Sequence, residues 1–243
     1  MTKIRELTLD AAQPAVIVSI MAADRETVLA RARRIVQSGA DIAEWRLDQL
    51  KDLTGAPEIL PELRATLGDL PLLTTVRSQA EGGLAALEAA KLVQLTDELC
   101  ASGLVDAVDV EISHPGAVDA QASAARHRVP VIGSRHLLDQ CPSADELVAI
   151  FEQIASQDVA VCKLAVTATS AIDVSNLLGA CARASGQLNQ PLIAIAMGDR
   201  GRITRVAGQV FGSVATFASL DGEASAPGQL DVVSLRQALT LFS

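Results

Sequence analysis

Short runs of β-branched and aliphatic residues recur along the chain, separated by roughly 20 to 35 residues, the size of a βα unit. Such runs are typical of buried parallel strands, which present apolar side chains on both faces. Eight runs fit this description, at residues 16–21, 42–47, 72–76, 107–112, 129–134, 159–166, 192–197 and 214–218.

Between these runs, apolar residues recur at three- and four-residue intervals, which predicts amphipathic helices. The predicted helices cover residues 27–37, 84–101, 144–156, 172–184 and 232–241. Asp24, Ser143 and Asp231 stand in front of three of them and are suited to cap their first turns. Eight strands alternating with helices predict a closed (β/α)8 TIM barrel, an α/β fold.

An open doubly wound sheet is the competing architecture, but it normally carries a glycine-rich turn after its first strand. The segment SIMAADRE that follows the first strand here has no glycine. Because no linker or composition shift divides the chain, we expect residues 1–243 to form one domain. Residues 1–12 precede the first strand and are expected to form a small cap over the bottom of the barrel.

The amino-acid composition of the chain restricts the kinds of partner that it can bind. The 243 residues include 49% hydrophobic and only 2% aromatic side chains, with no Tyr, and the net charge is −9. Neither aromatic stacking platforms nor a positive surface is available, so no nucleic-acid partner is expected. The four scattered cysteines include no CxxC pair, which favours reduced thiols in the cytoplasm and no zinc site. The chain has neither a signal-peptide pattern nor an apolar run long enough for a membrane span.

Charged side chains end several strands on one face. In IAEWRLD, Glu44, Arg46 and Asp48 share a face, while Trp45 and Leu47 share the other, which the helices would bury. In a barrel of this type, the functional groups gather at the carboxyl ends of the strands. The charged face therefore is expected to point into the barrel mouth. The same alternation pairs Thr75 with Arg77, Asp109 with Glu111, Ser134 with His136, and Ser19 with Met21.

Lys163 is the strongest single chemical signal, since it lies in the otherwise apolar strand VAVCKLAV. A buried, unpaired lysine has a lowered pKa and can attack a carbonyl to form a Schiff base. The alternative is a lysine whose stem packs while its head reaches water. His136 lies on the preceding strand and would face Lys163 across the mouth as a proton carrier, although a structural imidazole is the alternative there.

Three loops contain glycine and charge: EGG at 81–83, MGDRGRITR at 197–205 and EASAPGQ at 223–229. Glycine would let the backbone approach a ligand. Loops after the last two strands of such barrels often hold phosphate, but Arg205 would equally well grip a carboxylate, and Ser225 and Gln229 suit hydroxyl or carboxylate recognition. Composition and spacing leave both ligands open.

Taken together in chain order, the motifs EWRLD, TTVRSQAEGG, DVE, SRH, KLA, MGDRGRITR, FGS and SAPGQ resemble those of type I 3-dehydroquinate dehydratase, from about Ser19 to Gln229. The resemblance implies a (β/α)8 barrel that is usually a homodimer. It also implies a lyase that dehydrates 3-dehydroquinate to 3-dehydroshikimate in the shikimate pathway, with no metal and no organic cofactor.

The resemblance assigns three residues to catalysis. Lys163 of KLA would form the iminium with the substrate ketone, His136 of SRH would move the protons, and Glu81 of EGG would orient that histidine. The remaining matched positions would bind substrate, with Arg205 on its carboxylate and Ser225 and Gln229 on a closing loop. The full set of expected substrate contacts is Ser19, Glu44, Arg46, Arg77, Arg205, Ser225 and Gln229.

The chain departs from the family pattern around the histidine. Leu137 and Leu138 follow His136 where the family usually has Asp or Asn and then Phe, and Arg135 replaces a residue that is commonly aromatic. Two alternative functions therefore accompany the lyase: a catalytically weak paralogue that binds a shikimate-pathway metabolite, and a Schiff-base aldolase on the same barrel.

Overall fold

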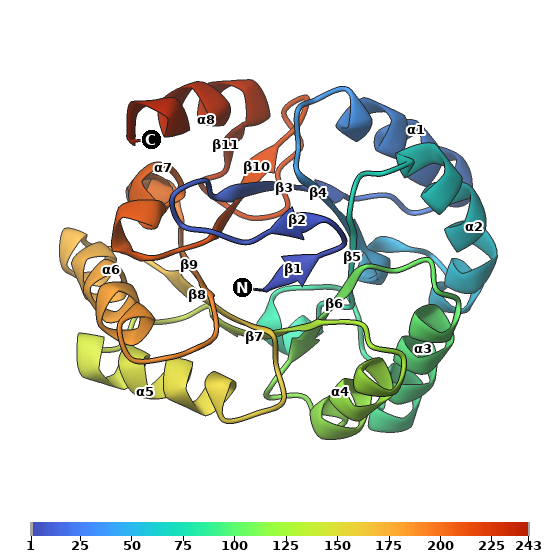
Figure 1. The fold of residues 1–243 in the computed structure, drawn as a ribbon, viewed down its shortest axis with the longest axis horizontal. Helices are drawn as coiled ribbons and strands as arrows, with labels where there is room; N and C mark the ends of the chain where they lie inside the picture. Colours follow the sequence, from blue (N-terminus) through green and yellow to red (C-terminus); the bar gives the residue numbers. More distant parts are fainter. Residues whose placement is uncertain (1, 243) are drawn as a thin grey trace.

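Eight parallel strands curl into a barrel in the computed structural model, which describes residues 2–242 (Figure 1). Their bounds are β3 Ala15–Ile20, β4 Ile42–Arg46, β5 Leu72–Thr75, β6 Ala107–Glu111, β7 Val131–Leu137, β8 Val161–Thr167, β9 Leu192–Met197 and β10 Ala215–Ser219. The sheet order is β10-β3-β4-β5-β6-β7-β8-β9, with the short strand β11 Leu230–Asp231 beside β10. All eight predicted strands are present, and the prediction of a (β/α)8 barrel is confirmed.

The barrel closes between its last two strands. The amide of Val214 donates to the carbonyl of Leu192 over 2.8 Å, and Leu192 forms a parallel bridge with Ser213. The Ser213 hydroxyl accepts the amide hydrogen of Ala194 at 3.2 Å, which adds a side-chain link where the ladder is short. The closure joins the first and last parts of the sheet, so the eight strand ends surround one opening.

Eight α-helices form the outer ring (Figure 1). They are α1 Arg25–Val36, α2 Ala56–Leu67, α3 Ala89–Ala101, α4 Ala117–Arg126, α5 Ala144–Ala155, α6 Ala171–Ser185, α7 Arg202–Ala207 and α8 Val232–Leu239. Short 3-10 turns accompany them: η1 Leu47–Gln49, η2 Leu53–Gly55, η3 Gln79–Glu81, η4 Asp199–Gly201, η5 Gly208–Phe211 and η6 Thr240–Phe242.

The five predicted helices are present, but the structure contains three more helices that the sequence pattern did not predict. Helices α2, α4 and α7 were not predicted: α2 carries an internal proline, Pro61, and α7 has only 6 residues. The expected start of α3 at residue 84 is wrong, because the helix begins at Ala89. The amide of Leu84 instead donates to Asp48 Oδ2 at 3.2 Å, which holds this segment as a loop across the barrel mouth.

The three predicted N-caps are confirmed. Asp24 accepts the amide hydrogen of Thr27 at the start of α1. Ser143 forms a capping box with Glu146 at the start of α5, and Asp231 accepts from the amide of Val233 at the start of α8. A side-chain acceptor at this position satisfies one of the amides that a helix start leaves unpaired.

Strand alternation separates two apolar cores. Trp45 and Leu47 are buried between the strands and the helices, as the sequence predicted. Ile17, Ile42 and Ile193 belong to a second cluster, which fills the inside of the barrel. On most strands the inner cluster lies toward the beginning and polar residues follow on the same inward face, at the carboxyl ends. Met197 and Phe217 extend the cluster to the cavity.

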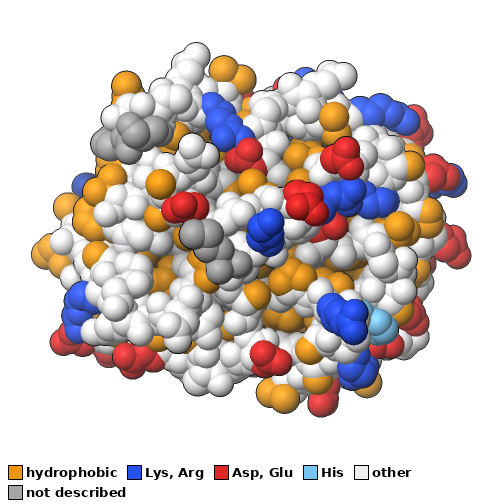
Figure 2. Space-filling view, viewed as in Figure 1, with side chains coloured by type: hydrophobic (Ala, Val, Ile, Leu, Met, Phe, Trp, Pro, Cys, Tyr) orange, Lys and Arg blue, Asp and Glu red, His pale blue; other side chains and the backbone are white. Residues whose placement is uncertain are grey.

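The N-terminal segment closes the bottom of the barrel, the end at which the strands begin. This confirms the predicted cap. Strands β1 Lys3–Ile4 and β2 Leu7–Thr8 pair antiparallel, and Figure 1 shows this hairpin lying across the barrel opening. Ile4 and Leu9 are buried and join the inner cluster. Figure 2 shows acidic and basic side chains interspersed on the face around this hairpin. The apolar plug leaves the carboxyl ends of the strands as the open end.

No helix within residues 2–242 is long and apolar enough to cross a membrane.

Candidate active site

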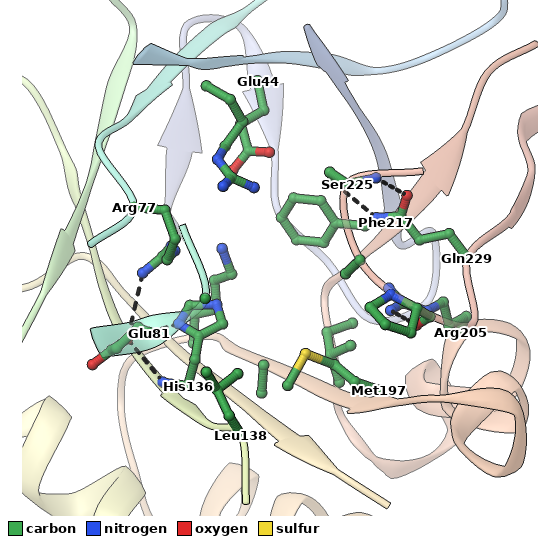
Figure 3. A pocket seen from close by; sticks show the side chains of 17 residues that line it. Glu44, Arg77, Glu81, His136, Leu138, Met197, Arg205, Phe217, Ser225 and Gln229 are labelled. Atoms are coloured by element: carbon green, nitrogen blue, oxygen red, sulfur yellow. Dashed lines mark hydrogen bonds and ion pairs between the residues drawn. The ribbon is translucent and has the colours of Figure 1, made fainter. Parts of the chain in front are cut away.

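A cavity of about 130 Å³ opens at the carboxyl ends of the strands (Figure 3). Nine of the ten site residues expected from the sequence line it: Glu44, Arg46, Arg77, Glu81, His136, Lys163, Arg205, Ser225 and Gln229. Ser19 does not line the cavity. Its hydroxyl lies behind the wall, hydrogen-bonded to Glu44 and, at 2.9 Å, to Ser225.

Lys163 is buried on β8, but the expectation that it would be unpaired is wrong. Its Nζ donates to Asp109 Oδ2 at 2.8 Å and lies 4.6 Å from the centre of the Phe217 ring. Asp109 belongs to β6, two strands away, and its side chain is fully shielded from solvent. The curvature of the barrel brings both inward-facing side chains together, so the ammonium has a carboxylate on one side and an aromatic face on another.

Arg77 and Asp109 organise the charges beneath the cavity. Arg77 Nη2 donates to Asp109 Oδ1 at 2.9 Å and Nη1 donates to Glu111 Oε1 at 2.9 Å, while the Ser134 hydroxyl donates to Asp109 at 2.6 Å. Burial opposes ionisation of Asp109, yet Arg77 and Lys163 outweigh it and hold the pKa of Asp109 well below its usual range. Burial likewise opposes the Arg77 charge, but the surrounding carboxylates raise the pKa of Arg77 above its ordinary value.

His136 and Glu81 form a hydrogen-bonded pair, visible in Figure 3. Glu81, at the end of η3, has Oε2 at 2.8 Å from His136 Nδ1 and also accepts the His136 amide hydrogen at 2.9 Å. The Ser113 hydroxyl donates to the other carboxyl oxygen. An ionised Glu81 accepts a hydrogen bond from Nδ1–H of a neutral imidazole, so the proton stays on Nδ1 and Nε2 keeps its lone pair.

Burial sets the protonation of this pair. It raises the pKa of Glu81 to about 7, with Glu111 adding to the rise and the Ser113 hydrogen bond opposing it. Burial, together with the positive charges of Arg77 and Lys163, holds the pKa of His136 well below its ordinary value. The imidazole is therefore neutral near pH 7 and able to accept a proton.

The EGG glycines allow the backbone to turn tightly beside the cavity, which Gly82 itself lines. A Cβ on Gly83 would lie 2.1 Å from the carbonyl oxygen of Arg77, and Gly82 has a φ of +86°. Only glycine adopts such a φ without cost and permits this approach. The tight return of the chain keeps Glu81 over the barrel mouth.

Glu44 and Arg46 occupy another side of the cavity, both from β4. Glu44 accepts hydrogen bonds from the hydroxyls of Ser19 and Thr75, the latter at 2.9 Å. Arg46 forms a bidentate pair with Asp48, at 2.7 Å and 2.8 Å. Burial opposes ionisation of Asp48, but the bonds from Arg46 lower its pKa below the ordinary value.

Arg205 differs from the other cations of the cavity because no carboxylate within residues 2–242 forms an ion pair with it. It lies on α7 with 1% of its surface exposed. Its side chain donates a hydrogen bond from Nη2 to the carbonyl of Pro227 at 3.3 Å. Burial lowers its pKa to about 10. An unpaired buried guanidinium that faces a cavity is suited to bind an anion.

Ser225 and Gln229 close the cavity from the loop after β10. Gln229 Nε2 donates to the Ser225 hydroxyl and Gln229 Oε1 accepts the Ser225 amide hydrogen, both at 2.9 Å (Figure 3). Gly228 between them has a φ of +80°, and a Cβ there would lie 2.4 Å from the carbonyl oxygen of Gly198. This glycine again permits contact between two backbone segments, the loops 197–205 and 223–229.

Several residues of the site had no role assigned from the sequence, among them Asp109, Ser113, Met197 and Phe217. Asp109 was recognised as an inward-facing strand residue, but its partner was not. Ser113, Met197 and Phe217 gave no signal, because a serine after a strand or an apolar residue within one is ordinary. Leu137 packs against the outer core, as its alternation with His136 predicts, whereas Leu138 lines the cavity.

Within residues 2–242, no group of three or more His, Cys, Asp and Glu side chains is placed to hold a metal ion. The cavity brings together a lysine, a neutral histidine and arginines with two carboxylates, Glu44 and Glu81. The lysine, the histidine and the arginines suit covalent chemistry on a carbonyl compound that also carries a negative charge.

Comparison with known proteins agrees with this chemistry. The family model of type I 3-dehydroquinase matches residues 16–243. The 3-dehydroquinate dehydratase of Lactiplantibacillus plantarum is 38% identical over 242 residues, covering 98% of this chain and 96% of the relative. That of Escherichia coli O9:H4 (strain HS) is 36% identical over 245 residues, covering 98% and 97%. The crystal structure of 3-dehydroquinate dehydratase from Geobacillus kaustophilus HTA426 matches with a TM-score of 0.94 at 32% identity, covering 99% of this chain and 95% of that one. The chain therefore belongs to the type I 3-dehydroquinase family.

Proposed function

We propose that this protein is a 3-dehydroquinate dehydratase of the shikimate pathway, which converts 3-dehydroquinate to 3-dehydroshikimate through a Schiff base on Lys163. The observation that carries the proposal is one cavity that contains a buried lysine, a neutral histidine held by a carboxylate, and an unpaired arginine. Membership of the type I 3-dehydroquinase family supports the same reaction.

In the first step, the Lys163 nitrogen attacks the substrate ketone. The nitrogen gives up one proton before attack and a second after the carbinolamine has formed, and both leave with the ketone oxygen as water, which gives the iminium. In total, the ammonium and the ketone yield the iminium and one water, and the positive charge on nitrogen is conserved. The iminium withdraws electrons and so acidifies the adjacent C–H bond.

In the second step, His136 Nε2 removes the proton from that carbon, which gives a neutral enamine and an imidazolium. The imidazolium then returns the proton to the departing hydroxyl, so water leaves and an α,β-unsaturated iminium remains. Hydrolysis of this iminium releases 3-dehydroshikimate and restores Lys163. Glu81 orients the ring throughout by accepting a hydrogen bond from His136 Nδ1–H.

Substrate binding is assigned to the rest of the cavity. Arg205 binds the substrate carboxylate, and the loop with Ser225 and Gln229 closes over it and excludes water. Glu44, which Ser19 holds from behind, accepts hydrogen bonds from the ring hydroxyls of the substrate. Arg46 donates hydrogen bonds to them. Arg77 is expected to contribute the least free energy to substrate binding, because its guanidinium is already hydrogen-bonded to Asp109 and Glu111.

The Arg205→Gln variant is expected to weaken substrate binding by about 2 to 4 kcal/mol, because a charge-assisted contact in a desolvated site is lost. Steady-state kinetics would show this as a rise in KM. Arg202→Gln is the matched control, since Arg202 lies on the same helix but is exposed and paired with Asp199. Equal KM values for wild type and Arg205→Gln would reject the assignment.

Activity is expected to fall as the pH drops below about 7, where Glu81 takes up a proton. A protonated Glu81 donates to His136 Nδ1, so the imidazole proton moves to Nε2 and the base is blocked. The pH dependence of kcat/KM measures this. Glu81→Gln should lose both most of the activity and the acidic limb. A wild-type profile that stays flat down to pH 5 would contradict this role.

Two assays test the function against its alternatives. Conjugated enone formation from 3-dehydroquinate, followed by absorbance, is expected, while retro-aldol cleavage of phosphorylated sugars is not. Cleavage without dehydration would establish the aldolase. Tight binding of dehydroquinate with no turnover by the native chain would establish the binding paralogue.

We further propose a homodimer of single-domain subunits in the cytoplasm. The family resemblance supports the dimer. One barrel sheet that extends from residue 15 to residue 231 supports a single domain, and four free cysteines support a reducing compartment. Light scattering on the purified protein decides the oligomeric state, with the mass of one subunit as the contrary result.

A further inference from the structure

Asp109 contacts the nitrogen that reacts, although nothing in the chemistry above uses it. We infer that Asp109 is a catalytic residue, the fixed counter-ion of the Lys163 nitrogen, which stabilises the ammonium before substrate binds and the iminium afterwards. This inference rests on the proposed Schiff-base function and adds to it the group that stabilises a buried cationic intermediate in this barrel.

The charge balance of the reaction explains why one carboxylate serves both states. The Lys163 ammonium carries one positive charge, and the iminium that replaces it carries one positive charge on the same atom, with water as the other product. Asp109 Oδ2 lies 2.8 Å from that atom in the free protein. A buried cation without its partner costs several kcal/mol, so the same hydrogen bond is required after the ketone has been captured.

The surroundings keep Asp109 ionised and in place. Its Oδ1 accepts from Ser134 at 2.6 Å and from Arg77 at 2.9 Å, which leaves Oδ2 for Lys163 alone. Phe217 lies against the ammonium at 4.6 Å, with its ring face toward the nitrogen. Asp109 therefore does not compete with His136 for protons. It holds a charge, and His136 moves the proton.

Glu111 provides a matched comparison on the same strand. It is buried, two residues from Asp109, and it also bonds Arg77, but its Oε1 accepts from Arg77 and from the amide of Ser78. Its carboxylate forms no ion pair with Lys163. Glu111→Gln and Asp109→Asn thus remove one negative charge each from the same cluster, and only the second removes it from the reacting nitrogen.

The experiment is borohydride trapping with 3-dehydroshikimate, read as the fraction of protein that gains the reduced adduct in intact-mass spectra. We expect Asp109→Asn to lower the trapped fraction at limiting borohydride by at least about ten-fold, as loss of a buried counter-ion predicts. Glu111→Gln should keep the adduct, even where its effect on Arg77 slows turnover. Equal trapping in Asp109→Asn and wild type would overturn the inference. No adduct in wild type would instead overturn the proposed function.

If Asp109→Asn does not fold, Ser134→Ala tests the counter-ion role. This variant removes the hydroxyl that holds Asp109 Oδ1 but leaves the carboxylate charge beside Lys163. Folding is checked by thermal unfolding, and the folded variant should trap the adduct at a level close to wild type. Loss of the adduct in folded Ser134→Ala would assign the effect to the arrangement of the network and overturn the counter-ion role.

Discussion

The Lys163→Ala variant is expected to lose dehydratase activity by roughly 10⁴- to 10⁶-fold, the range seen when an enzyme loses its covalent nucleophile. Without the amine, no iminium forms, and the C–H bond beside the ketone is too weak an acid for a neutral imidazole. Absorbance of the enone product measures the rate. The variant should still bind substrate, because Arg205 and the closing loop are unchanged.

Covalent labelling gives the same prediction a positive readout. Borohydride added with substrate or product should inactivate the wild-type protein and leave a stable mass increase on Lys163. The chain has three other lysines, Lys3, Lys51 and Lys91, which serve as internal controls in the peptide map. Lys91→Ala should retain activity and labelling. A label on Lys91, or no inactivation by borohydride, would reject Lys163 as the nucleophile.

His136→Ala is expected to lower kcat by about 10²- to 10⁴-fold, the usual contribution of a positioned acid and base. The variant keeps Lys163 and Asp109, so it should still capture the ketone and be labelled by borohydride. Capture without turnover separates proton transfer from Schiff-base formation. Turnover of His136→Ala within a few-fold of wild type would show that another group moves the proton.

Leu137→Asn is the control for that variant. Leu137 alternates with His136 on β7 and packs against the outer core, so the change should alter the rate only modestly. It also restores an amide of the kind the family usually carries at this position. Should the native chain show no turnover and Leu137→Asn restore it, the protein would be a binding paralogue that lost catalysis at this residue.

Local patterns were enough for the strands because parallel barrel strands are buried on both faces. The run 192–197 is apolar throughout and coincides with β9 Leu192–Met197. The same reasoning failed for α4 Ala117–Arg126, whose alanine-rich sequence carries a weak apolar stripe, and for α7 Arg202–Ala207, which is too short for a periodic signal. Those helices form because they shield the outward-facing apolar side chains of the neighbouring barrel strands from water.

Alternation along a strand determined which side chains point into the barrel. That rule, together with burial of the apolar face by the helices, placed Glu44 and Arg46 in the mouth and Trp45 toward the helices, and the structure agrees. The period of two is a property of each strand by itself, so it needs no knowledge of the strand's neighbours.

Partnerships between strands were decided only by the tertiary structure. Lys163 and Asp109 lie on β8 and β6, and their 2.8 Å contact depends on the register of β7 between them and on the curvature of the closed sheet. Among residues 2–242, no carboxylate forms an ion pair with Arg205, and this depends on how the loops pack around α7. The sequence determined the barrel and the chemical types at its mouth, because those follow from local periodicity. Which charges are paired and which one is left free for a substrate follows from distances across the barrel, which no local pattern encodes.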